Sequence, residues 1–217
     1  GEVRITSETS ELAPLLEDLL SPDLACLVSD GGDGALHWAL NAARPICEAR
    51  GWALPVALPT NGGTIDFVAR KAGVHGDALR IVHRLADRVR REGAAPSVEL
   101  DSLELTGEHV DGTPFRKLGF ALAAGGIGNR FFDKYYEDPD PGAHTIVRII
   151  LRTVGEFALA RVGAVRDASS SSHVFRPTNA RVTIDGEVVD TEVHAGLHAG
   201  AIDVNFAGVL RVFPFAR

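Results

Sequence analysis

Hydrophobic positions in the first part of the chain follow two different periods. Short apolar runs at 24–28 (LACLV) and 54–58 (LPVAL) predict buried strands. Longer stretches with one apolar face predict helices, and Pro45 within one of them predicts a kink or break. The predicted helices cover 8–20, 36–50, 65–73 and 77–91. The order of strand, loop, helix and strand is typical of an α/β domain, which we place at 1–95.

Beyond residue 96, apolar and polar residues alternate instead. This alternation predicts strands at 97–105, 117–124 and 182–189, the last folded into a hairpin at Asp185-Gly186. A single helical pattern covers 144–162, and the serine run Ser169–Ser172 predicts a loop. The second part, 96–217, is therefore expected to be a β-rich domain of the β-sandwich type.

Composition limits the class of protein. The chain has 217 residues, of which 45% are hydrophobic and 24% charged, and a net charge of −7. These values predict a soluble protein with no transmembrane segment and no nucleic-acid partner. Two cysteines are too few for a disulfide framework, so we expect a cytoplasmic protein. The chain opens at Gly1 and contains no methionine, which suggests a piece of a longer protein.

Glycines gather at the ends of both predicted strands. Gly31, Gly32 and Gly34 follow the first strand, and Gly62 and Gly63 follow the second. A glycine-rich loop before a helix allows a phosphate to approach unpaired backbone N–H groups. Such loops also occur as ordinary tight turns, so both interpretations stay open here.

Asp33 narrows the interpretation of the first loop. A carboxylate about 4 Å from a phosphate charge is repelled by roughly 4 kcal/mol at an effective dielectric near 20. Asp33 is therefore expected to face a hydroxyl group, a Mg²⁺ ion or solvent. The alternative is an aspartate that only accepts hydrogen bonds from the amides of its own turn.

Two segments resemble a known superfamily. GGDGALHWALNAA, residues 31–43, resembles the GGDGTLNEVVNGL-type signature of diacylglycerol kinases, sphingosine kinases and bacterial lipid kinases, including the spacing to Asn41. LPTNGGTIDFVARKAGV, residues 58–74, is similar to the second motif of that superfamily, with Gly63-Thr64 and Ala69-Arg70 in register. GFALAAGGIGNRFFDKYY, residues 119–136, resembles the segment after the domain boundary, more loosely.

The resemblance implies a fold and an activity. The fold is a Rossmann-like N-terminal domain of the NAD kinase and diacylglycerol kinase type, followed by the β-rich domain. The implied enzyme is a lipid kinase that transfers the γ-phosphoryl group of ATP, with Mg²⁺, to an alcohol group of a lipid such as diacylglycerol or a sphingoid base. The lipid would be presented at a membrane surface or as a monomer, with the protein cytoplasmic or peripheral at the membrane.

The resemblance also implies roles for particular residues. Asp33 would be the catalytic residue that acts on Mg²⁺ or on the acceptor hydroxyl. The phosphates of ATP would bind at Gly31, Gly32, Asp33, Gly34, Gly62, Gly63 and Thr64. FPFAR, which ends at Arg217, resembles a stretch that precedes the Asp-Gly element of the general base in bacterial members.

Departures from the superfamily pattern keep two alternatives open. Ala35 replaces a threonine, Asp66 an asparagine and Trp38 a glutamate. These differences favour a nucleotide-binding or lipid-binding homologue without catalysis. An NAD kinase-type enzyme, which shares the GGDG loop, is the other alternative.

Other polar residues carry weaker signals. His194 and His198 have the spacing of a helical zinc pair, but Gly196 and Gly200 argue against a helix. Lys134 and Arg148 would be solvated or would reach nucleotide phosphates. Asn129 would be a turn residue or would meet a lipid head group.

Overall fold

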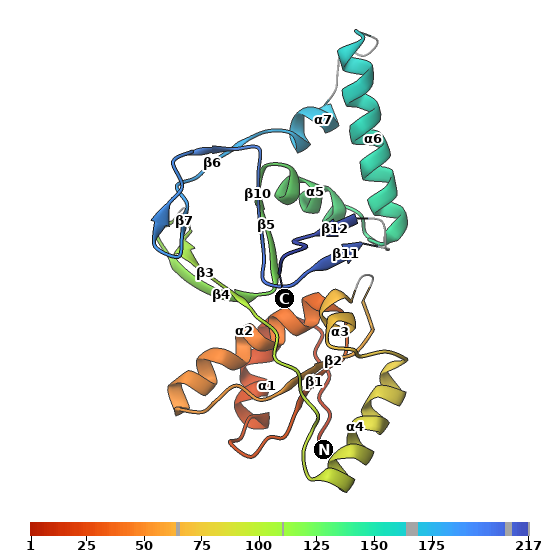
Figure 1. Ribbon diagram of the computed structural model, residues 1–217, viewed down its shortest axis with the longest axis vertical. Coiled ribbons are helices and arrows are strands. Elements are labelled where there is room, and N and C mark those ends of the chain that lie inside the picture. The colour runs from red at the N-terminus through yellow and green to blue at the C-terminus, as the bar shows by residue number, and fades with distance from the viewer. Residues whose placement is uncertain (64–65, 110, 164–168, 207–209, 217) are drawn as a thin grey trace. The chain divides into compact units, whose positions relative to one another are not determined.

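The computed structural model describes residues 1–63, 66–109, 111–163, 169–206 and 210–216 (Figure 1). The chain forms two compact units, which are described separately. Unit 1 joins Gly1–Ala121 to Gly200–Arg217, and unit 2 is Leu122–Ala199. The boundary expected near residue 96 lies within unit 1, and the division into an α/β and a β-rich domain stays a prediction.

Unit 1 contains the helices that the periodicity predicted. Its helices are η1 (Thr9–Glu11), α1 (Leu12–Leu19), α2 (Asp33–Arg50), α3 (Phe67–Lys71) and α4 (Ala78–Glu92). Its strands are β1 (Leu27–Ser29), β2 (Ala57–Pro59), β3 (Leu103–Glu108), β4 (Pro114–Gly119), β11 (Val204–Phe206) and β12 (Leu210–Val212). Helix α2 continues through Pro45, so of the predicted kink or break the break does not occur. It ends at Gly51, whose φ of 66° is the left-handed conformation that glycine adopts at helix ends.

The two predicted strands lie side by side. β1 and β2 are parallel, with Leu27 opposite Ala57 and Ser29 opposite Pro59. Parallel strands end at the same edge of a sheet, so the loops that follow them start at neighbouring positions. The Rossmann-like assignment is not tested by this one pair and stays a prediction.

Two apolar clusters hold unit 1 together. In the first, Leu36 and Leu40 of α2 and Val68 of α3 pack with Ile202 and Val204 of the terminal segment. The second is formed by α1, α2 and the residues before β1, and its buried members are Leu16, Leu20, Ala43 and Cys47. Helix α2 contributes to both clusters, so its first turn is anchored in the interior of the unit.

Unit 2 contains more helix than the alternation predicted. Its helices are α5 (Gly126–Tyr136), α6 (Ala143–Arg161) and α7 (Ser169–Val174). Its strands are β5 (Ala121–Gly125), β6 (Thr178–Asn179), β7 (Thr183–Ile184), β8 (Glu187–Val188), β9 (Val193–His194) and β10 (Gly196–Gly200), with β5 and β10 at its limits. The long helix predicted at 144–162 is confirmed as α6. The loop predicted at Ser169–Ser172 is wrong, because these serines are the first four residues of α7.

The strands of the described chain form two-stranded pairs. These pairs are β1–β2, β3–β4, β5–β10, β6–β9, β7–β8 and β11–β12. Asp185 and Gly186 connect β7 to β8, and both have positive φ, as expected for a tight hairpin turn. The β-sandwich stays a prediction. None of the helices in the described ranges is both long and apolar enough to cross a bilayer.

Candidate functional site

The loops after β1 and β2 meet through their backbones. A methyl group added to Gly32 would lie 2.6 Å from the Cα atom of Gly63, and one added to Gly63 would lie 2.5 Å from the Cα atom of Gly32. One on Gly62 would lie 3.0 Å from the Cα atom of Gly31. Only glycine, which has no Cβ atom, allows two backbone segments to approach so closely. The structure therefore brings together the two glycine groups that the sequence singled out, and loop packing by itself explains Gly32 and Gly63.

Buried polar side chains fix the first loop to the second. Thr60 is fully buried, and its hydroxyl donates a hydrogen bond of 2.6 Å to Asp30 Oδ1. The same hydroxyl oxygen accepts the backbone N–H of Gly31 at 3.1 Å. Of these two residues, Asp30 belongs to an Asp-Gly pair at the end of the first strand, whereas Thr60 carries only a weak signal in the sequence. That signal is the presence of a hydroxyl residue directly after an apolar strand, and this pattern is too common in proteins to predict a role for Thr60.

Asp33 connects the two loops to helix α3. It is the first residue of α2, and its carboxylate oxygens accept the backbone N–H groups of Phe67 at 3.1 Å and Val68 at 3.0 Å. These amides belong to the first turn of α3, where backbone donors have no partner within the helix. Asp33 therefore caps a helix of the second loop, a structural role that lies outside its own turn.

Asp66 has a similar structural role. It is buried, and its φ of 52° places it in the left-handed region that few aspartates occupy. Its Oδ1 atom accepts the N–H of Gly63 at 2.9 Å. The carboxylate that departs from the superfamily pattern thus holds the second loop in place.

The carboxylates give the site a negative character. Burial raises the pKa of Asp33 above its usual value, the two amide bonds lower it, and the nearby charge of Asp66 raises it further. The charge of Arg70 lowers the pKa of Asp33, and its effect is the smallest of these. An anionic ligand would therefore need a cation beside it.

The remaining predicted residues differ in what surrounds them. Gly34 is exposed in the first turn of α2, and a methyl group placed there would have nothing within 4 Å. A methyl group on Gly31, where φ is 151°, would lie 2.6 Å from Cβ of Ala35. Thr64 lies outside the described residues. Gly34 is consequently the predicted glycine that loop packing does not explain.

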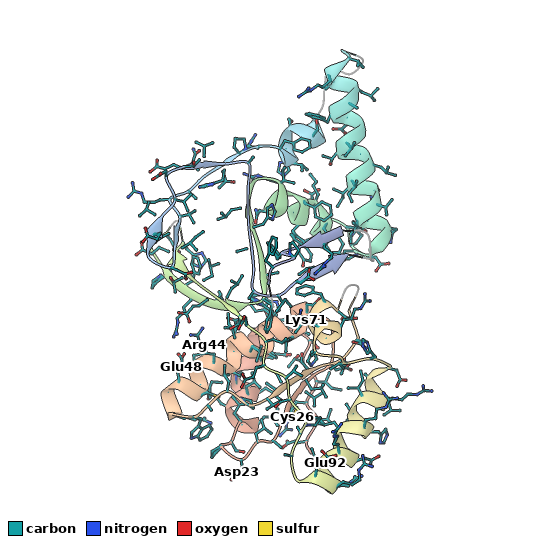
Figure 2. All side chains as sticks on the ribbon, viewed as in Figure 1. Asp23, Cys26, Arg44, Glu48, Lys71 and Glu92 are labelled. Carbon is teal, nitrogen blue, oxygen red and sulfur yellow. The ribbon has the colours of Figure 1, made fainter. Side chains whose placement is uncertain are left out.

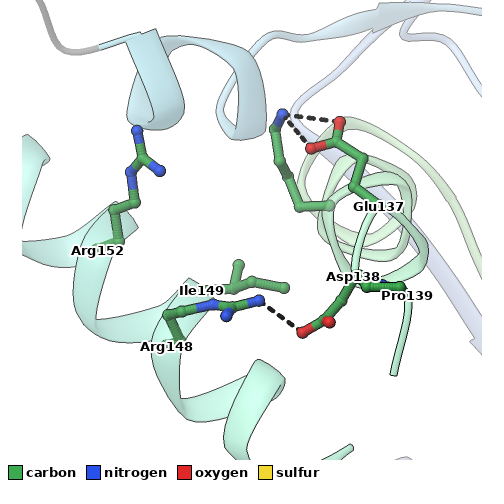
Figure 3. A pocket seen from close by; sticks show the side chains of 7 residues that line it. Glu137, Asp138, Pro139, Arg148, Ile149 and Arg152 are labelled. Atoms are coloured by element: carbon green, nitrogen blue, oxygen red, sulfur yellow. Dashed lines mark hydrogen bonds and ion pairs between the residues drawn. The ribbon is translucent and has the colours of Figure 1, made fainter. Parts of the chain in front are cut away.

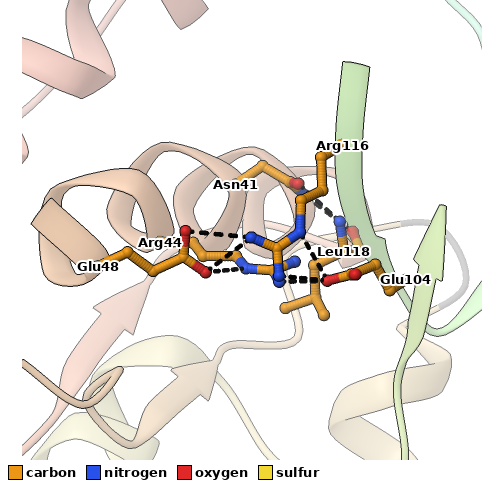
Figure 4. Close-up of polar contacts among 6 residues, drawn as sticks. All are labelled: Asn41, Arg44, Glu48, Glu104, Arg116 and Leu118. Atoms are coloured by element: carbon orange, nitrogen blue, oxygen red, sulfur yellow. Dashed lines mark hydrogen bonds and ion pairs between the residues drawn. The ribbon is translucent and has the colours of Figure 1, made fainter. Parts of the chain in front are cut away.

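The side chain of Asn41 pairs with a strand. Its Nδ2 donates to the carbonyl of Leu118 at 2.8 Å, and its Oδ1 accepts the N–H of Leu118 at 2.8 Å. The same Nδ2 also donates to the carbonyl of His37 at 2.8 Å. Asn41 thus attaches β4 to α2, and this role, rather than ligand contact, is what the structure gives it (Figure 4).

Ion pairs extend this attachment along α2. Arg44 and Glu48 project from α2 (Figure 2) and contact Glu104 of β3 and Arg116 of β4. Arg116 bonds to Glu48 at 3.1 Å and to Glu104 at 2.9 Å, while Arg44 bonds to both acids (Figure 4). Trp38 is half exposed on the same helix, and the centroid of its ring lies 5.7 Å from the ammonium of Lys117. These polar contacts join α2 to the hairpin in addition to the apolar packing of Leu118 against the first cluster.

Lys134 and Arg148 line a cavity of about 410 Å³ in unit 2 (Figure 3). Lys134 is paired with Glu137 at 2.8 Å, and Arg148 with Asp138 at 2.6 Å. Arg152 also lines this cavity and pairs with Glu156 at 2.9 Å. Each cation has an acidic partner within unit 2.

The histidine pair does not form a metal site in the described residues. His194 lies in β9 and His198 in β10, so the expectation that they are not helical is confirmed. The Nε2 atom of His194 lies 3.1 Å from the carbonyl of Ala180. Asn129 is exposed on α5 rather than in a turn. Within the described ranges, no three His, Cys, Asp or Glu side chains are grouped to hold a metal ion.

The chain is similar to a probable lipid kinase. It is 29% identical over 137 residues to a Pseudomonas aeruginosa (strain UCBPP-PA14) protein named "Probable lipid kinase YegS-like". The match covers 63% of this chain and 38% of that protein's length. No protein-family model matches the chain. No solved structure matches it.

This similarity confirms the resemblance to lipid kinases that the two glycine motifs indicated. The chain matches well under half of the relative. The activity, substrates and partners of the whole relative therefore enter below as proposals.

Proposed function

We propose that this chain is the nucleotide-binding and lipid-binding part of an ATP-dependent lipid kinase. The hydroxyl oxygen of a lipid, such as diacylglycerol or a sphingoid base, would attack the γ-phosphorus of ATP. The bond from that phosphorus to the β–γ bridging oxygen would break, ADP would leave, and the hydroxyl proton would pass to a base. Transfer of this kind depends mainly on positioning and charge neutralisation.

One observation supports this proposal most strongly. Two glycine loops meet at the carboxyl ends of parallel strands, directly at the N-terminus of the 18-residue helix α2. The first-turn amides of a helix and its dipole favour an anion at this position. Gly34, exposed with open space around it, leaves room for a phosphate to approach the backbone.

The residues present fit Mg²⁺ together with ATP. Mg²⁺ in phosphate-transfer sites is usually held by one or two carboxylates and by the phosphates themselves. Asp33 and Asp66 supply two carboxylates near the loops, and each keeps acceptor capacity beyond its backbone bonds. A bound Mg²⁺ would neutralise the repulsion between these carboxylates and the phosphates.

A second candidate is a binding protein without catalysis. The Asp33 carboxylate holds α3 with both oxygens, which favours a structural role over a catalytic one. The binding protein and the kinase would use the same phosphate site, but only the kinase would transfer the γ-phosphoryl group.

Calorimetry with Mg-ATP on the 217-residue chain tests the shared site. We expect Gly34→Ala to weaken binding by about tenfold or more, because its methyl group would occupy the space of a phosphate. Gly155→Ala in α6 is the matched control, since Gly155 also lies within a helix with nothing within 4 Å of an added methyl group. Absence of Mg-ATP binding, or equal binding by wild type and Gly34→Ala, would contradict the site.

Transfer of the γ-phosphoryl group separates the candidates. The acceptors are diacylglycerol and a sphingoid base in mixed micelles, with NAD as the third acceptor. Phosphorylated lipid supports the kinase, and phosphorylated NAD supports an NAD kinase-type enzyme. Mg-ATP binding without any product supports the binding protein.

A further inference from the structure

A lysine of β4 lies against the exposed surface of helix α2. Lys117 is exposed, and its ammonium lies over the ring of Trp38, 5.7 Å from the ring centroid. A cation at this distance from an aromatic face is attracted by the ring, so Trp38 favours one position of a flexible side chain. Trp38 belongs to α2 and is itself half exposed. The contact therefore holds a positive charge at the surface of this helix.

Lys117 differs from its neighbour on β4 in what neutralises its charge. Arg116 pairs with Glu48 and Glu104. For Lys117 the described ranges contain no ion pair, and the interaction that they do contain is the one with Trp38. An ammonium group without a carboxylate beside it keeps its donors and its charge available to an anion from solution.

Trp38 connects this lysine to the glycine that loop packing does not explain. Trp38 lies one helical turn beyond Gly34, on the same face of α2. Side chains on a helix lean toward its N-terminus, so the indole extends toward the turn that contains Gly34. It does not close the space there, because a methyl group on Gly34 would have nothing within 4 Å. Four residues of helix rise only about 6 Å, a distance that the flexible stem of a lysine can close.

The charge of Lys117 acts on the beginning of α2. The pKa of His37 is lowered, first by burial and then by the charge of Lys117. His37 precedes Trp38 and lies one turn beyond Asp33. The carboxylates of Asp33 and Asp66 make the two loops negative, so a bound phosphate needs a cation from outside the loops. Lys117 is placed to supply it.

We propose that Lys117 binds the phosphates of the nucleotide beside Gly34, and that Trp38 positions its ammonium group. This inference rests on the proposed function and adds the cation that the two loops lack. The ammonium would donate to phosphate oxygens that also accept first-turn amides of α2. It also gives a reason for one departure from the superfamily pattern. A glutamate at position 38 would pair with Lys117 and compete with the phosphates, whereas tryptophan holds the lysine without neutralising it.

Calorimetry with Mg-ATP and with magnesium tripolyphosphate on the 217-residue chain tests the inference. Lys117→Gln should weaken binding of both ligands at least about fivefold, because a charge-assisted hydrogen bond to phosphate is lost. The loss should shrink as salt is added, since salt screens exposed charges. Lys117→Arg keeps the charge and should bind within about twofold of wild type. Arg84→Gln on α4 is the matched control, because Arg84 is also exposed and also lacks an ion pair in the described ranges.

Variants of Trp38 test its positioning role. Trp38→Leu should weaken binding about two- to fivefold, and Trp38→Phe, which keeps an aromatic face, should recover most of the loss. The chain has two tryptophans, so the NMR signal of the Trp38 indole N–H can be assigned from the spectrum of Trp38→Phe. Saturating magnesium tripolyphosphate should shift this signal in wild type and shift it less in Lys117→Gln. Far-UV circular dichroism of each variant verifies its fold.

The outcomes separate this inference from the proposed function. If Gly34→Ala weakens Mg-ATP binding while Lys117→Gln binds like Arg84→Gln, the phosphate site stands and the role of Lys117 is overturned. If Lys117→Gln weakens binding of Mg-ATP but not of tripolyphosphate, the ammonium contacts the base or the ribose, and the inference is overturned as well. Wild type that binds neither ligand would overturn both proposals.

Discussion

The Asp33 carboxylate connects local backbone geometry to the candidate chemistry. It begins α2, ends the first glycine loop and accepts two amides of α3. A ligand that used this carboxylate would therefore act on both loops at once. The same bonds mean that removing the side chain affects stability as well as any activity.

Replacing Asp33 should produce a pH-dependent change in stability. Its pKa is raised in the folded state, mainly by burial, so the folded protein holds this proton more tightly than the unfolded chain does. The contribution of Asp33 to stability therefore decreases as pH rises through the interval between the two pKa values. We expect wild type to gain stability relative to Asp33→Asn as pH falls from about 7 to about 4. Urea unfolding at several pH values measures this difference.

Comparing Asp33→Ala with Asp33→Asn separates the effect of the carboxylate charge on stability from the effect of its hydrogen bonds. It leaves the first amides of α3 without their acceptor and should cost about 1–2 kcal/mol at neutral pH. Asp33→Asn keeps one acceptor and should cost less. A stability difference between wild type and Asp33→Asn that grows toward neutral pH would show that the amide bonds outweigh burial.

Helix α2 and the β3–β4 hairpin are joined by polar contacts. Asn41 supplies a donor and an acceptor to Leu118, in the manner of a neighbouring strand. Asn41→Ala should therefore destabilise unit 1 by about 2 kcal/mol, because two partly buried backbone groups lose their partner. Urea unfolding gives the free energy, and hydrogen exchange at the Leu118 amide gives the local effect.

Asn41→Asp refines this prediction. The aspartate keeps the acceptor for the Leu118 amide and loses the donor, so a carboxylate would face the Leu118 carbonyl. It should destabilise at least as much as alanine. Asn129→Ala is the control, because Asn129 is exposed on α5. An Asn41→Ala variant as stable as Asn129→Ala would mean that this pairing contributes nothing.

Elements with strong local signals could be predicted from the sequence. The α6 pattern, the Asp185-Gly186 turn and the two strand-to-loop-to-helix junctions all appear where periodicity and turn residues placed them. Helix α7 was missed because four serines have weak helix preference and are typical of loops. Helix α5 was missed because its glycine-rich start, Gly126 and Gly128, indicates a turn.

The candidate site was predictable only in part. Glycine spacing located both loops, and their backbone contact followed from parallel pairing. The carboxylate bonds of Asp33 to α3 and the pairing of Asn41 with Leu118 join positions 34, 35 and 77 residues apart. Such contacts depend on packing between distant segments, which no local pattern encodes.

Unit 1 is built from two stretches that lie far apart in the sequence. The terminal segment from Gly200 onward returns after unit 2 and packs on α2 and α3. Ile202 is fully buried there and Val204 nearly so, beside Leu36 and Leu40. The first turn of α2, at which the proposed phosphate site begins, is thus supported by residues from the far end of the chain.

Ile202→Ala should destabilise helices α2 and α3, because Ile202 packs against their buried side chains. Deleting a fully buried isoleucine side chain beyond Cβ typically costs about 2–5 kcal/mol, since a cavity remains. We expect hydrogen exchange to accelerate in peptides from α2 and α3, and to stay unchanged in α6, which belongs to unit 2. Ile150→Ala, exposed on α6, is the control, because little burial is lost there. Unchanged exchange in α2 with Ile202→Ala would mean that the N-terminal elements keep their core without the terminal segment.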